Sequence, residues 1–130
     1  MIEIETPCRG KKLSARAHFS GEDLWVLVSG GDLEHIGSVS LAVPRASLTG
    51  DGTDRATVST LNATGHKDDH IGNRFASALC SAFRCRVSVS CGIHFENLDQ
   101  GGIAEVVSIA MKLLVELENG LDDLRREIKN

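Results

Sequence analysis

The sequence has few aromatic residues and no tyrosine. Aromatic side chains make up 4% of the 130 residues, and there is a single tryptophan. Proteins that hold single-stranded nucleic acids usually stack the bases on exposed aromatic side chains. The formal net charge is -4, whereas binding to a phosphate backbone needs a clustered excess of Lys and Arg. We therefore expect no nucleic-acid partner.

The chain also lacks a long apolar run and a cysteine framework. No segment approaches the roughly 20 apolar residues of a membrane helix, and the N-terminal sequence MIEIETPCRGKK has no apolar signal-peptide core. The four cysteines, Cys8, Cys80, Cys85 and Cys91, form no C-x-x-C pair and are expected to be reduced. These absences predict a soluble cytoplasmic protein without membrane contact.

The composition that is present suffices for one core. With 130 residues, of which 42% are hydrophobic, residues 1–130 are expected to form a single domain. Polar and apolar residues alternate from Lys12 to Ser20, as in a half-exposed strand. Leu24 to Val28 is apolar throughout, which predicts a strand buried on both faces. Further strands are predicted over 35–43 (ended by Pro44), 56–62 and 85–93.

Two helices are predicted. One runs from about His66 to Phe83, with Thr64 as its cap. The other has apolar residues in alternating steps of four and three from Ile103 to Ile128, and Asn119-Gly120 leaves open whether it is one helix or two. This order predicts an α+β fold, with an antiparallel sheet of about five or six strands covered on one face by two main helices. A helix of about 26 residues spans roughly 39 Å, so we expect a homodimer that buries its excess apolar seam.

Glycine and histidine recur where predicted elements begin or end. Gly30 and Gly31 follow a strand, where glycine permits unusual backbone conformations and consecutive amides can bind an anion. His35 and Gly37 come shortly after them. A histidine there can bind a phosphate or act as an acid or base near neutral pH. The alternatives are a glycine turn and a histidine bonded to a backbone carbonyl.

The segment His66 to His70 lies at a predicted helix start. Free backbone amides at that end attract anions, and Lys67 adds a positive charge, although Asp68 and Asp69 oppose a phosphate. The two acids can instead cap the helix, bind a hydroxyl or orient a histidine. His66 and His70 are four residues apart, so they share a helical face and can bind a metal together with a third histidine.

His94 ends a predicted strand. It shares a strand face with Ser88, Ser90 and Gly92, small residues that leave room for a flat ligand. The alternative is that these small residues lie beneath a packed helix.

Three motifs together resemble a known family. They are Ser-Gly-Gly-x3-His-Ile-Gly-x-Val (Ser29 to Val39), Gly-His-Lys-Asp (Gly65 to Asp68) with Ile71, and Gly-Ile-His (Gly92 to His94). This pattern is similar to the small D subunit of gallate-type hydroxyarylic acid decarboxylases, which is described as prenylated-flavin chaperone-like. The resemblance spans about Leu24 to Ile103. It implies a domain like the small proteasome-assembly-chaperone fold, an α+β dimer.

The resemblance implies a non-catalytic accessory protein that binds prenylated FMN, or FMN, and assists its delivery to a decarboxylase. The cofactor-binding residues implied are Gly30, Gly31, His35, Gly37, His66, Lys67 and His94. No catalytic or metal-binding residue is expected on this reading. Two alternatives stay open: a metal-dependent enzyme that uses His66, His70 and a third histidine, and a protein-assembly module without a small ligand.

Overall fold

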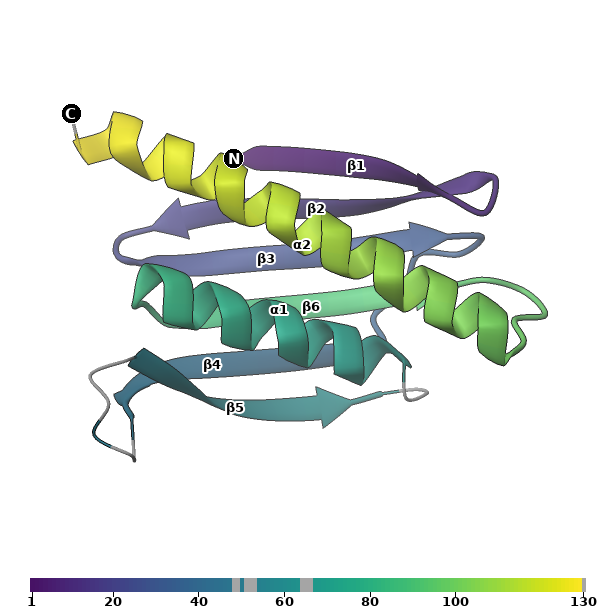
Figure 1. The fold of residues 1–130 in the computed structure, drawn as a ribbon, viewed down its shortest axis with the longest axis horizontal. Helices are drawn as coiled ribbons and strands as arrows, with labels where there is room; N and C mark the ends of the chain where they lie inside the picture. Colours follow the sequence, from purple (N-terminus) through teal and green to yellow (C-terminus); the bar gives the residue numbers. More distant parts are fainter. Residues whose placement is uncertain (48–49, 51–53, 64–66, 130) are drawn as a thin grey trace.

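The computed structural model describes residues 1–47, 50, 54–63 and 67–129. These residues form six strands and two helices, and Figure 1 shows how they are arranged. The elements are β1 (Ile2–Cys8), β2 (Lys11–Ser20), β3 (Asp23–Gly31), β4 (Ser38–Ala46), β5 (Asp54–Asn62), α1 (Lys67–Phe83), β6 (Val87–His94) and α2 (Gln100–Lys129).

All six strands belong to one sheet with the order β1-β2-β3-β6-β4-β5. Every neighbouring pair is antiparallel except β3 and β6, which are parallel. The last strand in the sequence therefore lies in the middle of the sheet, between β3 and β4 (Figure 1).

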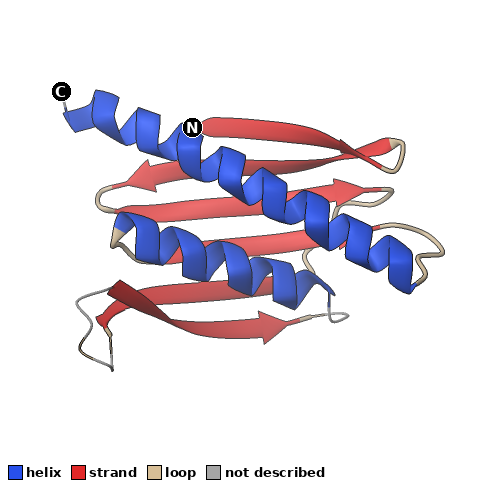
Figure 2. Cartoon of the chain, in the orientation of Figure 1, coloured by secondary structure: helices blue, strands red, loops and turns tan. Residues whose placement is uncertain are grey.

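Both helices cover the same face of the sheet (Figure 2). Alternate strand residues, such as Leu24, Val26 and Val28 of β3, point to that face and are buried together with Phe75 of α1 and Leu117 of α2. This confirms the expected α+β architecture. No helix of the described residues covers the opposite face of the sheet, and we call it the open face.

The open face corrects one prediction. Leu24 to Val28 was expected to be buried on both faces, but Trp25 and Leu27 are 54% and 38% exposed. The run is apolar throughout because both faces of β3 carry apolar residues, although only one face is covered. Exposed apolar residues also occupy the open face of β4, at Val39, Leu41 and Val43.

All five predicted strands differ from the observed bounds at one or both ends, and the difference is clearest at β4. The strand predicted over 35–43 begins at Ser38, so His35 lies in a loop, and it continues through Pro44 to Ala46. Pro44 is tolerated because pairing with β6 stops at Ala42, and a strand without a neighbour needs no amide on that side. β1 was not predicted, although Ile2 and Ile4 alternate with exposed glutamates.

The C-terminal helix α2 is continuous through Gly120. The Asp99 carboxylate accepts a hydrogen bond from the Gly102 amide at 2.7 Å and so caps the helix. The middle of the predicted seam, including Leu114, Leu117 and Leu121, is buried within the chain, whereas Ile103 and Ile128 are exposed. No helix in the described part of the chain is long and apolar enough to cross a membrane.

Candidate functional site

The sequence motifs meet at one end of the sheet. Because β3 and β6 are parallel, their carboxyl ends lie side by side, and Gly31 pairs with His94. The loop over residues 32–37 leaves β3 here and passes β6 to reach β4. α1 begins at the same end, since the Ser38 hydroxyl at the start of β4 donates to the Asp68 carbonyl at 2.9 Å.

Asp68 lies at the centre of this arrangement and is only 5% exposed. The Ile93 amide donates to its Oδ1 at 3.0 Å, and Nε2 of His35 lies 3.2 Å from its Oδ2. Pairing between β4 and β6 ends at Ser38 and Cys91, where the two strands diverge. The carboxylate therefore takes the place of a backbone partner for Ile93 and also fixes the His35 ring.

Two motif glycines make this contact sterically feasible. A Cβ at Gly37 would lie 2.7 Å from Cγ and 2.8 Å from Cβ of Asp68, and closer still to Oδ2. A Cβ at Gly92 would overlap the His35 carbonyl group and lie 3.2 Å from the His35 nitrogen. The backbone of the 32–37 loop thus lies directly on Gly92. The room that we expected at Gly92 for a flat ligand is filled by this loop.

Gly30 and Gly31 are placed inside the sheet rather than in an open turn. Gly30 pairs with Leu13 on one side and Ile93 on the other. Gly31 has a φ of 85° and a Cβ there would lie 2.9 Å from the His94 carbonyl carbon, so the left-handed conformation and close approach both require glycine. Both glycines therefore have a structural role in joining β3 to its neighbours.

The two motif histidines face each other at this end. The rings of His35 and His94 have centroids 6.1 Å apart and lie edge to face. Their side chains are 27% and 44% exposed, so each ring has a surface that a ligand can reach. His94 Nε2 lies 3.2 Å from Oε1 of the exposed Glu96, whereas His35 contacts the buried Asp68. The His94 ring is therefore the less constrained of the two.

The metal hypothesis depends on residues at the start of α1. His66 lies outside the described residues, and the Lys67 side chain is likewise not described. His70 is exposed and lines a shallow hollow of about 260 Å³ with Thr60, Asp69 and Asn73. Within the described ranges, no group of three or more His, Cys, Asp or Glu side chains could hold a metal ion.

The polar groups around the histidines are mostly acceptors. Asp68 and Glu96 contact the two rings directly, and Asp32 accepts a hydrogen bond from the Glu96 amide at 3.0 Å. Among the described residues, no buried side-chain nitrogen or oxygen lacks a hydrogen-bond partner. The described part of this end therefore suits a ligand that offers hydrogen-bond donors. It does not suit a phosphate, because nearby carboxylates repel an anion.

The role of Asp68 was left open by the sequence, which allowed it to interact with the helix dipole, cap the helix, bind a hydroxyl or orient a histidine. The structure places it against His35, as the last of these alternatives requires. Asp68 can be recognised as a site residue from the sequence because it belongs to the Gly-His-Lys-Asp motif, which occurs together with the other two motifs.

The comparison with protein families gave a clear result. The model of the prenylated flavin chaperone LpdD-like domain matches residues 8–122, a range that contains β2 to β6, α1 and most of α2. The comparison with curated proteins gave no match. Since the family model covers most of the chain and all three motifs lie within it, the chain belongs to the prenylated flavin chaperone LpdD-like domain family.

Proposed function

We propose that the chain is a non-catalytic accessory protein that binds prenylated FMN, or a related phosphorylated flavin, and assists its delivery to a hydroxyarylic acid decarboxylase. The proposal includes a cytoplasmic location. The family match supports a role as a flavin chaperone. The four cysteines are free and buried, in keeping with a reducing compartment.

The observation that carries the proposal is the convergence of the three motifs on His35 and His94. Asp68 fixes the His35 ring, and the adjacent His94 ring is accessible. A flat heterocycle is oriented in its site by polar groups that are held in fixed positions. When bound, the flavin supplies the reactive ring that a decarboxylase uses, whereas this chain holds the edge of that ring.

The phosphate of the cofactor requires a different group. Gly30 and Gly31 are paired in the sheet, so we assign the phosphate to the Lys67 ammonium, with His66 beside it in the sequence. Both residues precede Asp68, whose carboxylate is turned inward to Ile93 and His35. Of the two acids that oppose a phosphate in the sequence, Asp68 is thus engaged by the protein itself, on the side away from the proposed phosphate position.

The test uses three ligands, of which FMN and riboflavin differ only in the phosphate. Purified protein is titrated anaerobically with reduced prenylated FMN, with FMN and with riboflavin, and the bound flavin is measured after gel filtration and by flavin fluorescence. His94→Ala should weaken all three by about tenfold, the loss expected for one hydrogen bond. Lys67→Ala should weaken the two phosphorylated ligands and leave riboflavin unchanged.

His70→Ala serves as the matched control, because His70 is exposed on α1 and has no part in the proposed site. Its affinity for all three ligands should equal that of the unmodified chain. If the unmodified chain retains no flavin, or if His70→Ala weakens binding as much as His94→Ala, the proposal is wrong.

A further inference from the structure

A cavity lies at the end of the sheet opposite to His35 and His94. It is formed where the turn between β2 and β3 meets the C-terminal ends of α1 and α2, and Figure 1 shows these three segments at the same end of the sheet. Its volume is about 390 Å³, near the lower end of the range for pockets that hold small organic molecules. The residues that line it are Phe19, Gly21, Glu22, Arg84, Arg125 and Ile128. The proposed function makes no use of this cavity.

Arg125 of α2 is held in place by the end of α1. Its Nη1 donates to the Phe83 carbonyl oxygen at 2.8 Å, and its guanidinium carbon lies 5.6 Å from the centre of the Phe83 ring. The guanidinium carries further N–H donors and keeps its positive charge at neutral pH. Arg125 is also partly buried. A guanidinium that is fixed in this way is a preorganised group for binding a carboxylate.

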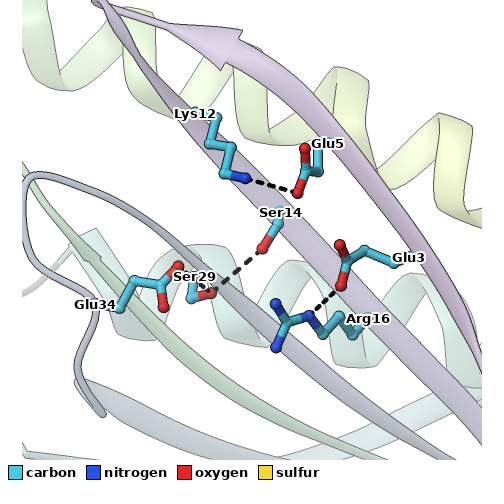
Figure 3. A network of polar contacts seen from close by, with 7 residues as sticks. All are labelled: Glu3, Glu5, Lys12, Ser14, Arg16, Ser29 and Glu34. Carbon is cyan, nitrogen blue, oxygen red and sulfur yellow. Dashed lines mark hydrogen bonds and ion pairs between the residues drawn. The ribbon is translucent and has the colours of Figure 1, made fainter.

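Among the described residues, no carboxylate forms an ion pair with Arg125. Other basic side chains of this acidic chain do contact carboxylates. Figure 3 shows Arg16 with Glu3 and Lys12 with Glu5, the latter pair at 2.9 Å. Since Arg125 contacts a carbonyl group and an aromatic ring instead, its charge is available to an anion in the cavity.

Apolar side chains and one carboxylate complete the lining. Phe19 and Ile128 offer apolar surface, and the Phe19 ring meets the Phe83 ring edge to face, with centroids 5.7 Å apart. Aromatic rings pack favourably on one another in such edge-to-face or offset arrangements. Glu22 is exposed in the turn, where its carboxylate repels a bare anion but accepts a hydrogen bond from a hydroxyl group. The lining therefore matches a small molecule that combines a carboxylate, a flat ring and a hydroxyl.

We propose that this cavity binds a small aromatic carboxylate that carries a hydroxyl group on its ring. The carboxylate binds the Arg125 guanidinium, and Arg84 adds a second positive charge to the wall. The ring packs against Phe19 and Ile128, and its hydroxyl donates to Glu22. Hydroxyarylic acids are also the substrate class of the decarboxylase in the proposed function, but this site does not depend on that function.

The first experiment titrates the isotope-labelled chain, without flavin, and follows the backbone amide signals by NMR. Para-hydroxybenzoate should bind with a dissociation constant below about 1 mM. It should shift the amide signals of Gly21 and Arg84, whereas those of Gly31 and His94, at the other end of the sheet, should not move. Benzoate, which lacks the hydroxyl, should bind about fivefold more weakly. Cyclohexanecarboxylate, which lacks the flat ring, and inorganic phosphate should bind more weakly than benzoate.

The second experiment repeats the titration with variants. Arg125→Met should raise the dissociation constant for para-hydroxybenzoate at least about tenfold, the loss expected for a hydrogen bond between charged groups. Arg126→Met is the matched control, because it removes the same charge from a neighbouring exposed residue that is paired with Asp122 at 2.7 Å. Its dissociation constant should change by less than about twofold, since exposed charges are screened.

Glu22→Ala tests the site independently of Arg125, because Glu22 is exposed in a turn and its replacement leaves the packing of α1 and α2 intact. Para-hydroxybenzoate should then bind no more tightly than benzoate. Far-UV circular dichroism of each variant should match that of the unmodified chain. If Arg125→Met is unfolded, Arg125→Lys, which keeps the charge but not the planar fork, replaces it and should also weaken binding.

The proposal is contradicted if about 10 mM para-hydroxybenzoate shifts neither Gly21 nor Arg84, since a cavity that fits should be saturated there. It is also contradicted if Arg126→Met weakens binding as much as Arg125→Met, or if phosphate binds as tightly as para-hydroxybenzoate, because charge alone would then account for the binding. Failure here leaves the proposed function untouched, since no flavin is present. A chain that binds para-hydroxybenzoate but no flavin contradicts only the proposed function.

Discussion

The tight contact between Gly37 and Asp68 provides a quantitative test of the site geometry. Gly37→Ala places a methyl group 2.7 Å from Cγ of Asp68, which forces the buried carboxylate to move. The hydrogen bond from the Ile93 amide and the contact with His35 would both be lost. A hydrogen bond to a charged group contributes about 1.5–3 kcal/mol. Since His35 is partly exposed, we expect a total loss of about 3 kcal/mol.

This loss is large for a domain of this size, whose free energy of unfolding is about 5–15 kcal/mol. Urea unfolding followed by far-UV circular dichroism, at one fixed protein concentration, should show the midpoint lowered by about 2 M. Gly101→Ala is the control, because its nearest neighbour is 3.6 Å away and alanine favours helix. It should be neutral or slightly stabilising.

A double-mutant cycle separates the steric conflict from other effects of the methyl group. Asp68→Gly removes the whole side chain that meets the new methyl group, whereas Asp68→Ala leaves its Cβ 2.8 Å away. Gly37→Ala should therefore cost almost nothing in the Asp68→Gly background, a coupling energy of about 3 kcal/mol. If the two costs are additive, or if Gly37→Ala alone changes stability by less than about 0.5 kcal/mol, the described geometry is wrong.

Three further predictions follow from burial. Gly92→Ala should reduce stability more than Gly37→Ala in the same urea assay, because the new methyl group meets the His35 backbone rather than a side chain; equal costs would contradict this. Leu117→Ala should cost about 2–5 kcal/mol, since Leu117 of α2 is fully buried, and a cost below about 1 kcal/mol would show that the helix is not packed as described. Burial raises the pKa of the Cys80 thiol to about 11 from an ordinary 9.0, so the folded state holds its proton where the unfolded state loses it. The free energy of unfolding should therefore fall as pH rises from about 9 to 11, and Cys80→Ala should make that fall less steep. An equally steep fall in the variant would show that Cys80 is not its cause.

The architecture could be predicted from the sequence because the period of the apolar residues and the order of the elements can be read directly along the chain. The alternation at β2 and the helical spacing from Ile71 to Leu79 reflect one covered face of the sheet, and both elements occur as predicted. The same reasoning misjudged Trp25 and Leu27. The same residue types occur on an uncovered apolar face and in a core, so periodicity cannot distinguish an exposed apolar face from an interior.

The site was only partly predictable for a different reason. Gly31, His35 and His94 were singled out by their positions at strand ends, and the structure brings them together. The role of Asp68 depends on where β4 and β6 diverge, which is a contact between residues 25 positions apart in the sequence. No local signal encodes that contact, and only the joint occurrence of the three motifs indicates it.

The central place of β6 has a consequence for how the protein is made. Until residues 87–94 have been synthesised, β1 to β3 and β4 to β5 have no strand that joins them, and each group exposes an unpaired edge. Contacts of such long sequence separation form slowly compared with local ones. Because His94 and the Ile93 amide arrive with the same strand, the sheet and the site are completed in one step. A ligand that contacts both His35 and His94 therefore cannot template the folding of β1 to β5 before β6 pairs between them.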